Sequence, residues 1–351
     1  MSERLAPEQW DSLPDVPESA ESVELVGHEA AVDGVCSAYR ARKLHHGLLV
    51  TGPKGIGKAT FAFHLAHYLL QNRDPDIAPD RFLPRDPSSA LFRQIATGAH
   101  PSVLHLTRRY DEKTKKFRTT VTVDEVRRVS RFLSMRSHDD SYRIVIVDAA
   151  DDMNRNAANA LLKSLEEPPQ QVVFVLVSHS PGALLPTIRS RCQVIRFSPL
   201  GSDELTIVLR RSGQSPPETG EARSAFEVAA GGSARQAILL TEYGGLDIAG
   251  AIDSYLGQTR RDPAIAYKLA DAVVGREQEI QFEIFNAALT DRIAAQASAH
   301  AAAGDHRAAA RLATLWTDIS ESVMLTETYN LDKRQHVVSL LDRVASAMRA
   351  A

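Results

Sequence analysis

The stretch LLVTGPKGIGKAT, residues 48–60, decides the fold of this chain. Its apolar start is typical of a short buried strand, and the apolar residues that follow it recur at helical spacing. Between strand and helix lie three glycines, Gly52, Gly55 and Gly57, which allow backbone N–H groups to turn inward around an anion. The helix N-terminus and the Lys58 ammonium add positive charge. The spacing from Gly52 to Lys58 therefore predicts a phosphate-binding loop.

The position after Lys58 departs from that motif. Ala59 stands where phosphate loops carry the serine or threonine hydroxyl that holds magnesium. Thr60 is one residue late, which turns its side chain by about 100° around the helix axis, so it is a poor substitute. Two interpretations stay open: a phosphate loop that binds nucleotide weakly or without hydrolysis, and a glycine-rich turn that binds none.

The composition is that of an ordinary globular protein. The 351 residues are enough for two or three domains, with 44% hydrophobic and 24% charged residues. The net charge of −3 provides no general basic field for nucleic acid. Any contact with DNA is therefore expected to be local or shared with partners.

The cysteine and hydropathy patterns predict a cytoplasmic protein without zinc. Cys36 and Cys192 are the only cysteines and lack C-x-x-C spacing, so they cannot form a structural zinc site of cysteines. No apolar run approaches the roughly 18 residues of a transmembrane helix. Residues 1–18 lack the apolar core of a signal peptide. We therefore expect a reducing compartment and no membrane contact.

Residues 143–148, RIVIVD, are the second informative stretch. A continuous apolar run is typical of a strand buried on both faces of a parallel sheet. It ends on Asp148 at the carboxyl edge of the sheet, where α/β proteins bind ligands and a carboxylate can hold magnesium through water. A helix-capping or solvent-facing role is the alternative for Asp148. Ala149 follows, where many ATPases of this design carry the glutamate that activates water.

Two arginine-rich segments each have a structural and a functional interpretation. Arg189, Arg191 and Arg196 lie close together in the sequence, and surface ion pairs would explain them without any further role. Residues 107–118 mix basic with acidic side chains, as a solvated hairpin does. Contact of that hairpin with DNA or with a partner is the alternative.

Taken together, these stretches resemble the clamp-loader branch of the AAA+ proteins. The resemblance rests on HHG before the phosphate loop, VD followed by AANALLKSLEEPP, TIRSRC, and GSAR, at residues 45–47, 147–148 with 157–169, 187–192 and 232–235. The motifs occur in order and with compatible spacing over roughly residues 25–198. The GSAR motif extends the match because it is similar to the second sensor motif of the family's lid domain.

The resemblance implies a fold of three parts. We expect an α/β AAA+ P-loop domain, with a parallel sheet and flanking helices, over residues 25–198. A small helical lid domain would follow over 199–245, and an all-α collar domain for oligomerisation over 246–351. Residues 1–24 are expected to be a flexible lead-in. The long alanine-rich helical patterns after residue 247 agree with a packed bundle.

The resemblance also implies the site residues. Those carried over as nucleotide-binding are Gly52, Gly55, Gly57, Lys58, Ala59, Thr60, Asp148, Ser178 and Arg235. Arg191, in the Ser-Arg-Cys motif, would act in trans as an arginine finger on the ATP of a neighbouring subunit. A guanidinium on the γ-phosphate stabilises the charge that develops there, an effect of about 10³–10⁵ in rate.

The function implied is that of a non-hydrolysing subunit of the DNA polymerase III clamp loader, which helps to load the sliding clamp on primed DNA during chromosomal replication. Its partners would be the motor ATPase subunits and the delta subunit in a hetero-pentamer and, through that complex, the clamp and primer-template DNA. Related subunits carry a four-cysteine zinc module between the phosphate loop and the aspartate strand; no cysteine lies in that region here, so no zinc is expected.

Two departures from the family concern hydrolysis. Ala59 and Ala149 each remove part of the hydrolytic apparatus, so we expect no ATPase or polymerase site within this chain. The glycines and Lys58 are retained, so ATP or ADP would bind weakly or without hydrolysis. The alternatives are a self-sufficient AAA+ ATPase, such as the motor subunit of a loader, and a nucleotide-dependent scaffold unrelated to replication.

Overall fold

The computed structural model describes residues 4–134, 141–258, 262–275, 278–329 and 331–350. The chain divides into two compact units: Met1–Gly213 with Ala230–Arg235, and Gln214–Ala229 with Gln236–Ala351. The residues of the predicted lid are thus distributed over both units. The boundaries predicted at residues 198 and 245 stay a prediction.

The first unit is built on a five-stranded sheet with the order β2-β5-β6-β1-β7. Its strands are β1 (Gly47–Thr51), β2 (Val103–Leu106), β5 (Arg143–Asp148), β6 (Val172–Ser178) and β7 (Gln193–Arg196). All neighbouring strands in this sheet pair in parallel. The three central strands are apolar runs buried on both faces, which explains why their sequences are continuous and do not alternate.

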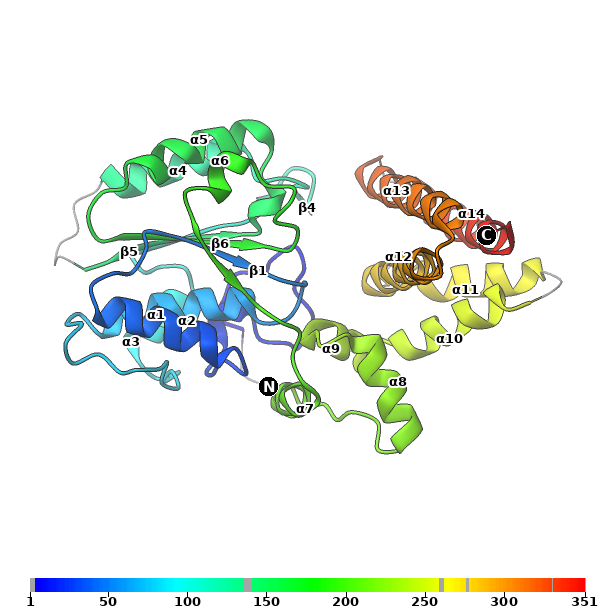
Figure 1. The fold of residues 1–351 in the computed structure, drawn as a ribbon, viewed down its shortest axis with the longest axis horizontal. Helices are drawn as coiled ribbons and strands as arrows, with labels where there is room; N and C mark the ends of the chain where they lie inside the picture. Colours follow the sequence, from blue (N-terminus) through cyan, green and yellow to red (C-terminus); the bar gives the residue numbers. More distant parts are fainter. Residues whose placement is uncertain (1–3, 135–140, 259–261, 276–277, 330, 351) are drawn as a thin grey trace. The chain divides into compact units, whose positions relative to one another are not determined.

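Helices cover both faces of this sheet (Figure 1). Those on one face are α1 (Glu29–Arg40), α2 (Lys58–Gln71) and α3 (Ala90–Ala96), and those on the other are α4 (Val123–Ser134), α5 (Arg155–Glu166) and α6 (Pro186–Arg189). Successive residues of a strand point to opposite faces of the sheet, and each face has its own hydrophobic core. Leu48 and Val50 pack with the first set of helices, and Leu49 packs with the second. The predicted α/β architecture is confirmed.

The register of the strands brings three chain segments to one edge of the sheet. Thr51 pairs with Ser178, and Val177 pairs with Asp148. The glycine-rich loop leaves β1 directly after Thr51 and enters α2 at Lys58. The loop, Asp148 and Ser178 therefore share the carboxyl edge, where parallel α/β sheets bind their ligands.

The N-terminal residues, which the sequence suggests are a flexible lead-in, have buried side chains and a short helix; their flexibility stays a prediction. Residues 1–3 lie outside the described residues, and residues 4–24 include the 3-10 helix η1 (Ser19–Glu21). Ala6, Leu13 and Ala20 are buried. These three apolar side chains are spread among polar residues without a helical or strand period. The sequence pattern therefore does not indicate that the segment packs onto the domain.

A short hairpin forms within the basic segment 107–118. β3 (Tyr110–Asp111) and β4 (Lys116–Phe117) pair antiparallel. The Asp111 carboxylate accepts hydrogen bonds from the backbone N–H groups of Lys113 and Thr114 at 3.0 and 3.3 Å, which closes the turn. The hairpin is confirmed; its contact with DNA or a partner stays a prediction.

The rest of the described chain is helical. After β7 the chain forms α7 (Ser202–Arg211), which belongs to the first unit. The helices that follow are α8 (Gly220–Ala230), α9 (Ala234–Glu242), α10 (Gly245–Leu256), α11 (Pro263–Val273), α12 (Glu279–Ala302), α13 (His306–Tyr329) and α14 (Lys333–Ala350). In the second unit α12 packs along α13, and α11 packs on α14. Their apolar faces bury Phe285, Leu289 and Leu341. The predicted helical C-terminal region is confirmed.

Candidate functional site: a phosphate loop and a remote arginine

The loop between β1 and α2 has the backbone of a phosphate cradle. Its three glycines adopt positive φ angles of 144°, 77° and 101° at Gly52, Gly55 and Gly57. The close approach at Gly55 also demands glycine, because a Cβ there would lie 2.4 Å from Ser233 Oγ and 2.5 Å from Arg235 Cβ. Only glycine adopts such conformations without strain. The loop is thus shaped as the sequence predicts.

Lys58 lies at the N-terminus of α2 and is buried. Its ammonium donates to the Gly52 carbonyl at 2.7 Å and to the Pro53 carbonyl, so it is bound to the loop's own backbone. Burial lowers the pKa of Lys58 to about 8, although the charge of Asp148 counteracts this shift. Ala59 and Thr60 follow in the first helical turn, both partly buried. The methyl of Ala59 offers no oxygen to a metal ion.

Asp148 lies at the end of β5 as predicted, in a desolvated environment. Burial raises the pKa of its carboxyl to about 7; the charge of Asp11 adds to this rise and that of Lys58 opposes it. Asp148 and Lys58 are thus close enough to influence each other. The strand register brings the loop and Asp148 to the same edge of the sheet; that they form one nucleotide site stays a prediction.

Ser178 is buried at the end of β6, and its hydroxyl has an internal partner. Its Oγ donates to Asp151 Oδ1 at 2.7 Å. The same carboxylate accepts from the backbone N–H groups of His179 and Ser180 at 2.5 and 3.3 Å. Asp151 therefore fixes the end of β6. Sequence reasoning missed it, although it lies only three residues after Asp148.

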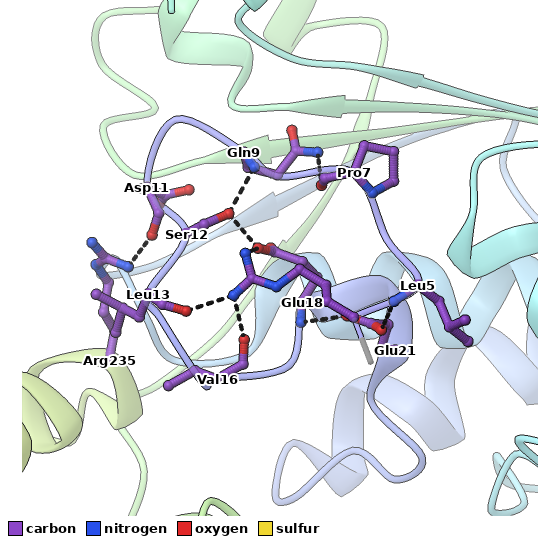
Figure 2. Close-up of polar contacts among 11 residues, drawn as sticks. Leu5, Pro7, Gln9, Asp11, Ser12, Leu13, Val16, Glu18, Glu21 and Arg235 are labelled. Atoms are coloured by element: carbon purple, nitrogen blue, oxygen red, sulfur yellow. Dashed lines mark hydrogen bonds and ion pairs between the residues drawn. The ribbon is translucent and has the colours of Figure 1, made fainter. Parts of the chain in front are cut away.

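Arg235 lies beside the loop, as the sensor motif implies. Its backbone N–H donates to the Gly55 carbonyl at 3.3 Å, and Ser233 Oγ donates to the Lys54 carbonyl at 2.9 Å. The guanidinium of Arg235 donates to the backbone carbonyl of Asp11 (Figure 2). The GSAR motif is thus joined to the phosphate loop through both backbone and side chain.

Two further residues at the loop come from the N-terminal segment. The carboxylate of Asp11 lies 3.5 Å from Lys54 Nζ. The ring of Trp10 contacts two cations, with Lys54 Nζ 4.2 Å and the Arg108 guanidinium 3.8 Å from its centroid. Arg108 is also held by the Asp152 carboxylate at 2.6 and 2.7 Å. Sequence reasoning missed Trp10 and Asp11; a tryptophan in a polar segment was the only signal.

Arg191 lies at the opposite edge of the sheet. It precedes β7, whose Gln193 pairs with Leu48, and its backbone oxygen approaches Gly47 at the start of β1. The five residues of β1 therefore separate it from the phosphate loop, a length of about 16 Å at the usual rise of a strand. Arg191 cannot reach a ligand on its own loop across this sheet.

The Arg191 guanidinium is held in place by its surroundings. Nη2 lies 2.7 Å from the Glu166 carboxylate, and Nη1 donates to the Thr187 carbonyl at 2.9 Å. The side chain remains 35% exposed, so a partner could still reach it. This arrangement fixes the direction of the arginine without burying it.

Within the described parts of the chain, no group of three or more histidine, cysteine, aspartate or glutamate side chains is arranged to hold a metal ion. No helix in those same parts has the length and hydropathy that crossing a membrane requires.

A phosphate loop that follows one strand of a parallel sheet, with the aspartate strand two positions away at β5, defines a P-loop α/β domain. Comparison with known proteins narrows this class. Residues 27–201 match the family described as "DNA polymerase III, delta subunit". Through these residues the chain belongs to the DNA polymerase III delta-prime family of AAA+ clamp-loader proteins.

Relatives named DNA polymerase III subunit delta′ are similar to part of this chain. The DNA polymerase III subunit delta′ of Pseudomonas aeruginosa is 38% identical over 154 residues, 42% of this chain and 41% of the relative. That of Escherichia coli is 30% identical over 199 residues, 51% of this chain and 55% of the relative. The chain thus spans about half the length of these curated relatives.

A solved structure of a DNA polymerase III gamma subunit-related protein from Thermotoga maritima covers 92% of this chain and 99% of its own. Its TM-score is 0.44 at 17% identity.

Proposed function

We propose that this chain is a non-hydrolysing subunit of a bacterial DNA polymerase III clamp loader, and that Arg191 completes the ATP site of a neighbouring ATPase subunit. The observation that carries this proposal is the position of Arg191: it is accessible, oriented by Glu166, and at the sheet edge opposite its own phosphate loop. An arginine so placed can act on a nucleotide only in another subunit.

The residues of the chain's own phosphate loop also support a subunit that binds nucleotide but does not hydrolyse it. The cradle of Gly52, Gly55 and Gly57 and the buried Lys58 fit the phosphates of a nucleotide. Ala59 lacks the magnesium hydroxyl, and Ala149 lacks the carboxylate that would activate water. Nucleotide would bind here weakly or without hydrolysis, and the chain would depend on its neighbours for turnover.

The partners in this proposal are motor ATPase subunits and a delta-type subunit in a hetero-pentamer. The sliding clamp and primer-template DNA would be engaged through that complex, in the cytoplasm. The net charge of −3 agrees with DNA contact that is shared among subunits.

A reconstituted loader tests this function. Arg191→Ala should reduce DNA-stimulated ATP turnover and clamp loading, because the charge developing on the neighbour's γ-phosphate loses its guanidinium. Arg189→Ala removes an exposed arginine two residues away and serves as the control. Unchanged turnover and loading with Arg191→Ala, in a complex of normal composition, would refute the proposed role.

A further inference from the structure

We propose that residues 4–18, here called the N-terminal strap, are an internal occupant of the phosphate-loop site and compete there with a nucleoside triphosphate. The strap would set the nucleotide affinity of this chain in addition to the alanine at position 59. This inference concerns the chain's own loop and does not depend on the role of Arg191.

The strap binds the groups that a nucleotide would need. Asp11 presents a carboxylate to Lys54 at 3.5 Å and a backbone carbonyl to the guanidinium of Arg235 (Figure 2). A carboxylate oxygen is an anionic acceptor, as a phosphate oxygen is. Lys54 belongs to the loop, and Arg235 is joined to it through Gly55. Phosphates that entered the loop would therefore compete with Asp11 for both cations.

Trp10 fastens the strap beside these contacts. Its ring contacts Lys54 and Arg108 at 4.2 and 3.8 Å. Arg108 is itself anchored to Asp152, so the ring rests against a fixed cation. A strap that leaves the loop must break both ring contacts together with those of Asp11.

The strap has a structure of its own. Arg4 donates to the carbonyls of Leu13 and Val16 at 2.6 and 3.0 Å and lies 3.4 Å from the Glu18 carboxylate. Ser12 accepts from the backbone of Gln9 at 2.7 Å and donates to Glu18 (Figure 2). Leu13 is 4% exposed. A preformed loop loses little conformational freedom when it lies on the site, which favours the closed state.

The charge of Asp11 reaches the interior of the site. It contributes to the raised pKa of Asp148, and it opposes the lowering of the pKa of His179. Asp11 thus lies within the electrostatic range of groups on β5 and at the end of β6. The negative charge of Asp11 therefore acts on the same groups that the phosphates of a bound nucleotide would influence.

Occupancy by the strap has a measurable consequence. The apparent dissociation constant for a nucleotide equals the intrinsic constant divided by the fraction of molecules with an open site. If the strap is closed in nine of every ten molecules, the affinity falls by about tenfold, and it recovers when the strap is released.

The test is the equilibrium binding of a fluorescent ATP analogue with magnesium to the full chain. Trp10→Ala/Asp11→Ala should bind the analogue about tenfold or more tightly than wild type. Glu8→Ala removes an exposed carboxylate from the same strap and should bind as wild type does. Adding Lys58→Ala to the double variant should abolish the gain, which assigns it to the phosphate loop. A double variant that melts early is replaced by Trp10→Phe/Asp11→Asn.

A second readout follows the strap itself. The chain has two tryptophans, so Trp316→Phe leaves Trp10 as the sole reporter. In that background, saturating ATP should change the Trp10 emission as the ring leaves its cations. Equal ATP affinity of wild type and a folded strap variant would overturn the proposal. So would ATP binding that leaves the Trp10 emission unchanged.

Discussion

Asp148 is a carboxyl whose burial opposes its ionisation. Its pKa is raised from 3.8 to about 7, mainly by desolvation. The folded state therefore holds this proton more tightly than the unfolded state does. The contribution of Asp148 to the free energy of unfolding is largest below about pH 4 and is lost as the pH rises through about 7.

This loss of stability with rising pH gives a prediction for Asp148→Asn, whose side chain is neutral at every pH. The variant should melt at a higher temperature than wild type at about pH 8, and the difference should shrink toward about pH 4. Thermal unfolding followed by circular dichroism across this range measures it. Asp33→Asn changes an exposed carboxylate on α1 and is the control. If the melting temperatures of Asp148→Asn and wild type differ by the same amount at both pH values, Asp148 does not lie in a desolvated environment that raises its pKa.

Gly55 combines two constraints that a paired comparison can separate. Gly55 and Gly98 have φ angles of 77° and 69°, but a Cβ at Gly98 would meet nothing within 4 Å. Gly98→Ala therefore tests the backbone alone, for which we expect about 1 kcal/mol of destabilisation. Gly55→Ala must also displace Ser233 and Arg235, so it should destabilise by about 2–4 kcal/mol. If urea unfolding shows the same loss in the free energy of unfolding for both variants, the GSAR motif does not pack closely against Gly55.

At the scale of elements, the ends of α5 and α6 together orient Arg191. Glu166 is the last residue of α5, and Thr187 lies in α6. The carboxylate of Glu166 and the backbone carbonyl of Thr187 both contact the Arg191 guanidinium. Because the ion pair between Arg191 and Glu166 is partly exposed, it contributes little to the free energy of unfolding. Its main effect is to orient the Arg191 guanidinium.

Glu166→Ala should therefore weaken the action of Arg191 while the fold stays intact. We expect DNA-stimulated ATP turnover of the reconstituted loader to fall by about two- to tenfold, less than with Arg191→Ala. The melting temperature of the chain should change little. Glu167→Ala, at the next exposed position, is the matched control. Identical turnover in the two glutamate variants would show that Glu166 does not position the arginine.

The elements that the sequence predicts best are those with a strong local pattern. The runs at 47–51, 143–148 and 172–178 are continuous and apolar because both faces are buried, so each is evident as a strand. The phosphate loop is evident because its glycines have fixed spacing. The contacts of the strap could not be predicted in this way, since Trp10 and Asp11 meet Lys54 and Arg235 only through long-range packing that leaves no period in the sequence.

At the scale of the whole molecule, the chain retains a nucleotide cradle but lacks two groups that hydrolysis uses. Ala59 and Ala149 are both in the first unit, which also holds Arg191. We therefore expect the purified full chain to show no ATP turnover above background, with or without Lys58→Ala. A robust rate that Lys58→Ala abolishes would favour the self-sufficient ATPase.

The most direct measurement is the burst of ATP hydrolysis when the reconstituted loader meets clamp and primed DNA. Wild-type and Arg189→Ala complexes should give the same burst amplitude. In the Arg191→Ala complex the amplitude should fall by about one ATP per complex, because only the site next to this chain loses its arginine. An Arg191→Ala complex with the full wild-type amplitude and rate would contradict the account.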